Sequence, residues 1–138
     1  MWSLNRKKSK SLINIFLKSK EKNIQLDFYR ENGEVLLQIF KGYDVSLWEV
    51  DLEFLKNDNI VYQLLFHKDK TNNDGNLKRF EDSFMYSNFK KVDFYNQEAY
   101  FYVQSINLPK ELENKISEIL NEVYDIGLDQ IKLTLNAY

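Results

Sequence analysis

The dipeptide Asn32-Gly33 lies between two runs rich in apolar residues, IQLDFYR at 24–30 and EVLLQIFK at 34–41. Asn and Gly both tolerate the positive φ angles of a type I′ turn, which makes Asn-Gly the strongest short signal for a hairpin. The pattern therefore predicts an antiparallel β-hairpin closed by a type I′ turn. We therefore expect the fold of this chain to contain that hairpin.

Other stretches also predict strands. Residues 45–54, VSLWEVDLEF, alternate apolar and acidic residues from Trp48 to Phe54, and residues 60–68, IVYQLLFHK, are typical of a more buried strand. Val92 and Phe94, followed by residues 99–106, predict one or two more. The tail, DQIKLTLNAY, fits either a strand or one helical face, and its alternation favours the strand.

Three segments carry apolar residues at helical spacing: residues 9–22, residues 77–89 and the segment from Pro109 to Gly127. Pro109 suits the first turn of a helix and Gly127 suits its end. Hairpin-length connections between the strands favour antiparallel pairing. The sequence therefore predicts one α+β domain over residues 1–138. Its mostly antiparallel sheet has about five to six strands, and its N-terminal, middle and C-terminal helices pack on one face.

The composition favours a folded protein, because 43% of the 138 residues are hydrophobic. The six apolar residues of LINIFL are fewer than a signal-peptide core contains, and no run approaches the length that spans a bilayer. We expect a cytoplasmic protein that does not insert into membranes. Residues 1–22 carry seven Lys or Arg and one acidic residue, while residues 23–138 carry twelve and twenty. The chain therefore has a basic N-terminal segment and an acidic body.

The segment KTNNDGNLKRFE, residues 70–81, resembles a calcium-binding EF-hand loop, with Gly75 and Glu81 at the expected positions. Lys70, however, occupies the position of the first oxygen ligand. We therefore expect no bound metal, and we predict that Asp74 or Asn76 caps a helix that Leu77, Phe80 and Phe84 anchor in the core.

Signatures of catalysis are weak in this sequence. His67 is the only histidine, and the chain has no cysteine, no phosphate-binding loop and no nucleophile motif. We therefore expect a protein that is not an enzyme and needs no cofactor. An enzyme that uses carboxylates, lysines or tyrosines remains the third alternative.

Two groups of residues are candidates for binding a partner protein. The acidic group projects from one face of the strand predicted over 45–54, and the aromatic group comes from a segment with more aromatic area than one strand face can bury. The candidates are Glu49, Asp51, Glu53, Tyr95, Tyr100 and Tyr102. We do not expect nucleic acid to be the partner, because no reader motif accompanies the basic N-terminus and the body is acidic.

In size, acidic body and predicted architecture the chain resembles the small single-domain immunity proteins of bacterial toxin systems. The resemblance implies that it neutralises a cognate toxin by direct binding, with the candidates above as contacts. The stretches LINIFLKSKEKNIQLDFYRENGEVLLQIF and YFYVQSINLPKELENKISEILNEVYD are also similar in layout to secretion chaperones of bacterial injection systems. That alternative implies a homodimer that holds an unfolded segment of a secreted effector. The sequence leaves the oligomeric state open.

Overall fold

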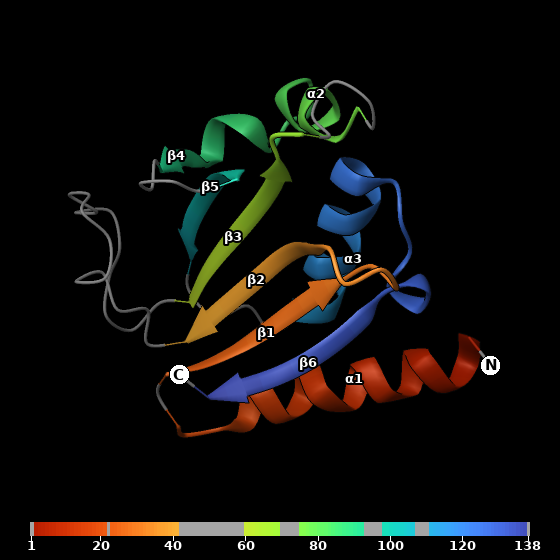
Figure 1. Ribbon diagram of the computed structural model, residues 1–138. Helices are drawn as coiled ribbons and strands as arrows, with labels where there is room; N and C mark the ends of the chain where they lie inside the picture. The colour runs from red at the N-terminus through yellow and green to blue at the C-terminus, as the bar shows by residue number, and fades with distance from the viewer. Residues whose placement is uncertain are drawn as a thin grey trace.

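The computed structural model describes residues 2–21, 23–41, 60–69, 75–92, 98–106 and 111–137 (Figure 1). These residues form three α-helices, two short 3-10 helices and six strands. In chain order the elements are α1 (Trp2–Lys18), β1 (Ile24–Tyr29), β2 (Val35–Lys41), β3 (Ile60–His67), α2 (Asn76–Glu81), η2 (Tyr86–Asn88), β4 (Lys90–Val92), β5 (Ala99–Ile106), α3 (Leu112–Tyr124), η3 (Leu128–Gln130) and β6 (Lys132–Ala137). The predicted α+β class is confirmed.

All six strands form one antiparallel sheet in the order β4-β5-β3-β2-β1-β6. The predicted hairpin is β1 with β2, in which Leu26 lies opposite Ile39. On its other side Leu26 lies opposite Leu135 of β6, so the tail is a strand, as its alternation favoured. A helix at this position would leave the backbone groups along one edge of β1 unpaired.

The three helices cover one face of the sheet, as predicted. Ile13 and Phe16 of α1, Phe80 of α2 and Ile116 of α3 belong to a single buried cluster with alternate residues of the strands, such as Leu26. In this layer α1 lies along β1 and β6, and α3 contacts both α1 and α2 (Figure 1). The hydrophobic core therefore lies between the sheet and the helices.

The turn of the first hairpin differs from the prediction. Gly33 has a φ of 90°, but Asn32 does not have a positive φ, so the turn is not type I′. The Gly33 amide donates to the Arg30 carbonyl and the Arg30 amide donates to the Glu34 carbonyl, each at 2.9 Å. These bonds enclose a three-residue loop that ends in a left-handed glycine. The Asn32 side chain accepts the Glu34 amide at 3.0 Å instead of adopting the left-handed conformation itself.

The middle helix is shorter than predicted. It ends at Glu81, and the chain continues through turns into η2. Phe80 is buried and Leu77 packs at the edge of the core, but Phe84 is 67% exposed. The prediction that Phe84 anchors this helix was wrong, because helical spacing no longer applies once the helix has ended. The strand predicted over 45–54 lies outside the described residues.

The N-cap residue of the middle helix is Gly75, not Asn76. Gly75, with a φ of 72°, occupies the N-cap position and makes no side-chain cap bond. Asn76 is the first helical residue, and its side-chain oxygen accepts a hydrogen bond from the Arg79 guanidinium. The positive φ explains the glycine, since other residues rarely adopt it. Asp74, the other predicted cap, lies outside the described residues.

The end of α3 lies before Gly127, contrary to the prediction. The helix stops at Tyr124, where Asp125 takes a left-handed φ of 52°, whereas Gly127 has a negative φ. Arg79 of α2 donates through Nε to the Val123 carbonyl at 3.2 Å. A cation at a helix C-terminus is favourable because the last carbonyls carry partial negative charge. Arg79 therefore joins α2 to the end of α3.

The predicted N-terminal helix is longer at its start, since α1 begins at Trp2, and it ends at Lys18 instead of residue 22. Lys41, at the end of β2, donates to the Phe16 carbonyl and, at 3.0 Å, to the Ser19 carbonyl. Burial lowers the pKa of Lys41. The lysine thus supplies the cation for the C-terminus of α1 from a distant part of the chain.

Candidate protein-binding surface

The structure describes two of the six candidate binding residues. Tyr100 and Tyr102 lie two residues apart on β5 and project to the helix side of the sheet, where Tyr102 joins the core cluster. Glu49, Asp51, Glu53 and Tyr95 lie outside the described residues.

A surface depression lies between α2 and the β4–β5 end of the sheet. Its two tyrosines come from β5, one lysine comes from β4, and the remaining residues come from the start and the exposed side of α2. The depression is lined by Gly75, Leu77, Lys78, Glu81, Lys91, Tyr100 and Tyr102. We call this site the α2–β5 depression.

The two tyrosines make different contributions to this site. Tyr102 is only 7% exposed, and its ring contacts Phe66, Phe80 and Tyr86 at centroid distances of 5.8, 5.0 and 6.1 Å. Tyr100 is half-buried and packs at the margin of the core. Tyr102 is therefore mainly a core residue that forms the base of the depression, while Tyr100 offers surface to a partner.

Lysine ammonium groups surround the Tyr100 ring. The Nζ atom of Lys91 lies 4.6 Å from the ring centroid and that of Lys68 lies 5.1 Å from it. Lys91 is held on β4, where it pairs with Tyr102, and Lys68 directly follows β3. Each contact lies within the range of a cation–π interaction, which orients the lysine side chain over the ring.

Phe84 and Tyr86 extend the apolar surface beside the depression. Phe84 is 67% exposed and Tyr86 is 38% exposed. The Tyr86 ring contacts Phe80 at 5.3 Å and also contacts Tyr102, so this turn adjoins the base of the depression. Sequence reasoning missed both residues, because it continued the middle helix through them.

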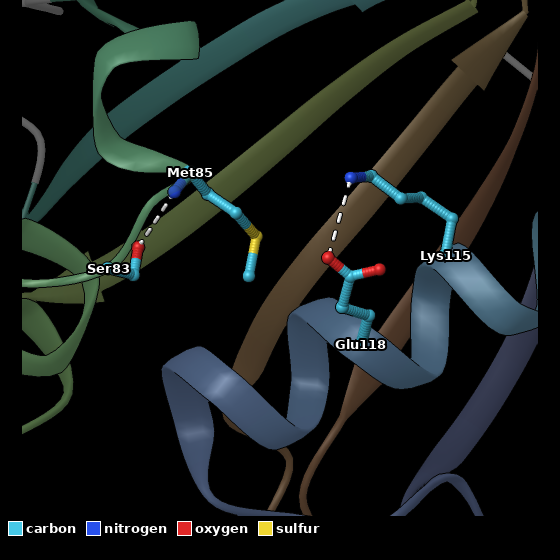
Figure 2. Close-up of polar contacts among 4 residues, drawn as sticks. All are labelled: Ser83, Met85, Lys115 and Glu118. Carbon is cyan, nitrogen blue, oxygen red and sulfur yellow. Dashed lines mark hydrogen bonds and ion pairs between the residues drawn. The ribbon is translucent and has the colours of Figure 1, made fainter.

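Ser83 builds the turn that exposes Phe84. Its hydroxyl donates to the Phe80 carbonyl at 2.7 Å and accepts the Met85 amide at 3.3 Å. Figure 2 shows the Met85 side chain directed away from Ser83 toward α3, which carries the Lys115–Glu118 ion pair of 3.9 Å. Because Met85 is buried on the core side, the preceding residue, Phe84, is directed to the surface.

A row of polar side chains crosses four strands on the sheet face opposite the helices. The Asp27 carboxylate accepts amide groups from Gln25 at 2.9 Å, Gln38 at 2.9 Å and Asn136 at 2.8 Å, and Gln38 accepts the amide of Gln63 at 2.7 Å. Since a carboxylate only accepts, the direction of each bond in the row is determined. The row ends at the buried Gln63 Oε1, which has no hydrogen-bond partner among the described residues.

Catalytic chemistry finds little support in the described part of the chain. The Nε2 atom of His67 lies 3.0 Å from the Val35 carbonyl, so the ring makes a structural hydrogen bond. No group of three or more His, Cys, Asp or Glu side chains among the described residues is arranged to hold a metal ion. None of the helices that the structure describes has both the length and the apolar character needed to cross a bilayer.

No family model, curated protein or solved structure matches this chain.

Proposed function

We propose that this chain is a protein-binding module of the immunity or inhibitor type, which neutralises a bacterial toxin by binding it directly. The proposed contact surface is the α2–β5 depression together with the adjoining turn that carries Phe84 and Tyr86.

The exposure of Phe84 carries the proposal. A phenylalanine that is 67% exposed leaves most of its apolar area in water, and covering such a side chain contributes about 1.5–3 kcal/mol. Tyr86 and Tyr100 add aromatic area with polar ends beside it. Tyrosine and phenylalanine are both enriched in protein interfaces, and tyrosine is also enriched among binding hot spots.

The rigidity of the support also favours a binding surface. Phe80 and Tyr102 pack beneath the depression, and Ser83 holds the turn with two hydrogen bonds. A surface of this kind loses little conformational freedom when a folded partner covers it. This favours a folded toxin domain as the partner over the unfolded client segment of a secretion chaperone.

The test uses a substitution at Phe84 and a matched control. Toxin domains are sought among the products of the neighbouring genes and co-expressed with the protein, and the affinity is measured by calorimetry. We expect Phe84→Ser to weaken binding by about 30-fold, the size of one hot-spot residue. Ile15→Ser replaces a 51% exposed residue on the outer side of α1 and should leave the affinity unchanged.

Two outcomes would reject the proposal. Equal affinities of Phe84→Ser and the wild type for the toxin domain would show that this surface does not contact the partner. A homodimer that grips an extended segment, in place of a one-to-one complex with a folded domain, would favour the chaperone alternative.

A further inference from the structure

Lysines dominate the charged groups at the α2–β5 depression. Lys78 and Lys91 line it, and the Lys68 ammonium lies over the ring of Tyr100, which is itself part of the lining. Glu81 is the acidic residue among the lining side chains. Although the body of the chain is acidic, the charged groups described at this site are mainly cations, which favours an anionic ligand.

The geometry places these cations around an aromatic surface. Lys91 is held at 4.6 Å from the Tyr100 centroid and belongs to a strand, so its position is restricted before any partner binds. Lys78 is exposed on α2, next to the apolar side chain of Leu77. A ligand that fills the depression would therefore meet ammonium groups at its rim and apolar contacts from Leu77 and Tyr100.

We propose that the α2–β5 depression binds an acidic segment of the partner protein. Carboxylates of that segment pair with Lys78 and Lys91, and an apolar side chain between them packs on Leu77 and Tyr100. This inference rests on the proposed protein-binding function and adds the chemistry of the partner. It places acidic residues on the partner at this site, in addition to any basic residues that would contact the acidic candidates of this chain.

The first experiment uses a hexaglutamate peptide as the probe and NMR spectroscopy of the full chain as the readout. We expect saturable shifts of the Tyr100 ring and Lys91 side-chain signals, and no such shifts with hexalysine. An oligothymidine of equal charge is the second probe. Tighter binding of oligothymidine than of hexaglutamate would mean that the site selects phosphates, and would overturn the proposal.

The second experiment measures the affinity for the toxin domain after charge reversal. The variant Lys78→Glu/Lys91→Glu should weaken binding by about tenfold or more, because close charge pairs across an interface become repulsive. The control Lys8→Glu/Lys10→Glu makes the same change of net charge at exposed positions on α1 and should have little effect. Thermal unfolding of both variants verifies that they are folded.

The outcomes separate this inference from the proposed function. Weakening confined to Lys78→Glu/Lys91→Glu supports the acidic segment. Equal weakening in both variants would assign the effect to net charge and overturn the inference. If Phe84→Ser abolishes binding while Lys78→Glu/Lys91→Glu retains it, the protein-binding function stands and the acidic segment is rejected.

Discussion

The hydroxyl oxygen of Tyr124 lies 2.6 Å from the carbonyl oxygen of Leu36. The contact joins the C-terminal end of α3 to a bulge of β2, where the register shifts so that Leu36 has no partner residue on β1. The same hydroxyl accepts the Leu65 amide at 3.2 Å. The pairing of β2 with β3 ends at Leu37 and Leu64, and the Tyr124 hydroxyl lies just beyond that pair. There it forms hydrogen bonds with backbone groups that the two strands do not pair with each other.

Substitution of Tyr124 by phenylalanine should lower the free energy of unfolding by about 1–3 kcal/mol. The ring still packs on Phe66, at 5.6 Å, but the buried carbonyl of Leu36 and amide of Leu65 lose a partner. Urea unfolding measures the difference.

Tyr62→Phe is the matched control for that substitution. The Tyr62 hydroxyl is equally buried but has no hydrogen-bond partner in the part of the chain that the structure describes, so its removal should leave stability at neutral pH unchanged or slightly raised. Equal losses in the two variants would show that the Tyr124 hydrogen bonds do not explain the effect.

Tyr62 should make stability depend on alkaline pH. Burial, and then the nearby Glu118 carboxylate, raise the pKa of Tyr62 above its ordinary value. Above about pH 10 the unfolded chain therefore releases this proton while the folded chain retains it, so the free energy of unfolding falls as the pH rises. The contribution is fully present below that pH.

The measurement compares urea unfolding of the wild type and Tyr62→Phe at neutral pH and at about pH 11. We expect the wild type to lose more stability than the variant between the two conditions. An identical loss in both proteins would contradict the assignment to Tyr62.

Asp27→Asn should disrupt the polar row on the sheet face opposite the helices. The new side chain keeps one oxygen and replaces the other with NH2, so either the Gln38 amide, 2.9 Å from Oδ1, or the Asn136 amide, 2.8 Å from Oδ2, would face a second donor. We expect a loss of about 1–2 kcal/mol in the free energy of unfolding. The control Asp82→Asn makes the same chemical change at an exposed position and should leave the free energy of unfolding unchanged. If thermal unfolding shows Asp82→Asn to be less stable than Asp27→Asn, this account of the row is rejected.

Arg79→Met should loosen the junction between α2 and α3. The variant loses the hydrogen bond from Nε to the Val123 carbonyl and the bond to Asn76, but it keeps an unbranched apolar stem. We expect about 1 kcal/mol of destabilisation, because the guanidinium is largely at the surface. Lys78→Met on the same helix should cost less. Faster amide hydrogen exchange at the end of α3 in Arg79→Met alone would support the assignment.

Local patterns in the sequence were sufficient for most elements of the fold. The Asn-Gly signal predicted the hairpin of β1 and β2, apolar and aromatic runs predicted β3 and β5, alternation favoured the tail strand β6, and helical spacing predicted α1 and α3. These signals succeed because each reports which side of one element is buried. They fail at Phe84, where spacing cannot reveal that Ser83 has already turned the chain.

The candidate site was predictable only in part. An excess of aromatic residues indicated Tyr100 and Tyr102. The sequence does not show, however, that Lys68, which follows β3, and Lys91 of β4 both lie against the Tyr100 ring. Likewise, the distinction between a core tyrosine and a surface tyrosine on β5 depends on Phe80, which α2 brings over Tyr102.

By itself, the sequence determined the α+β class, the antiparallel hairpin around Gly33 and the buried faces of the strands, since these depend on neighbours along the chain. Only the tertiary structure decided that the Tyr124 hydroxyl pairs backbone groups between β2 and β3, and that Phe84 is exposed. It also decided that Lys41 and Arg79 donate to carbonyls at the C-terminal ends of helices far from them in sequence. The physical reason is that backbone groups left unpaired at a bulge or a helix end take whichever donor or acceptor the packing brings near them.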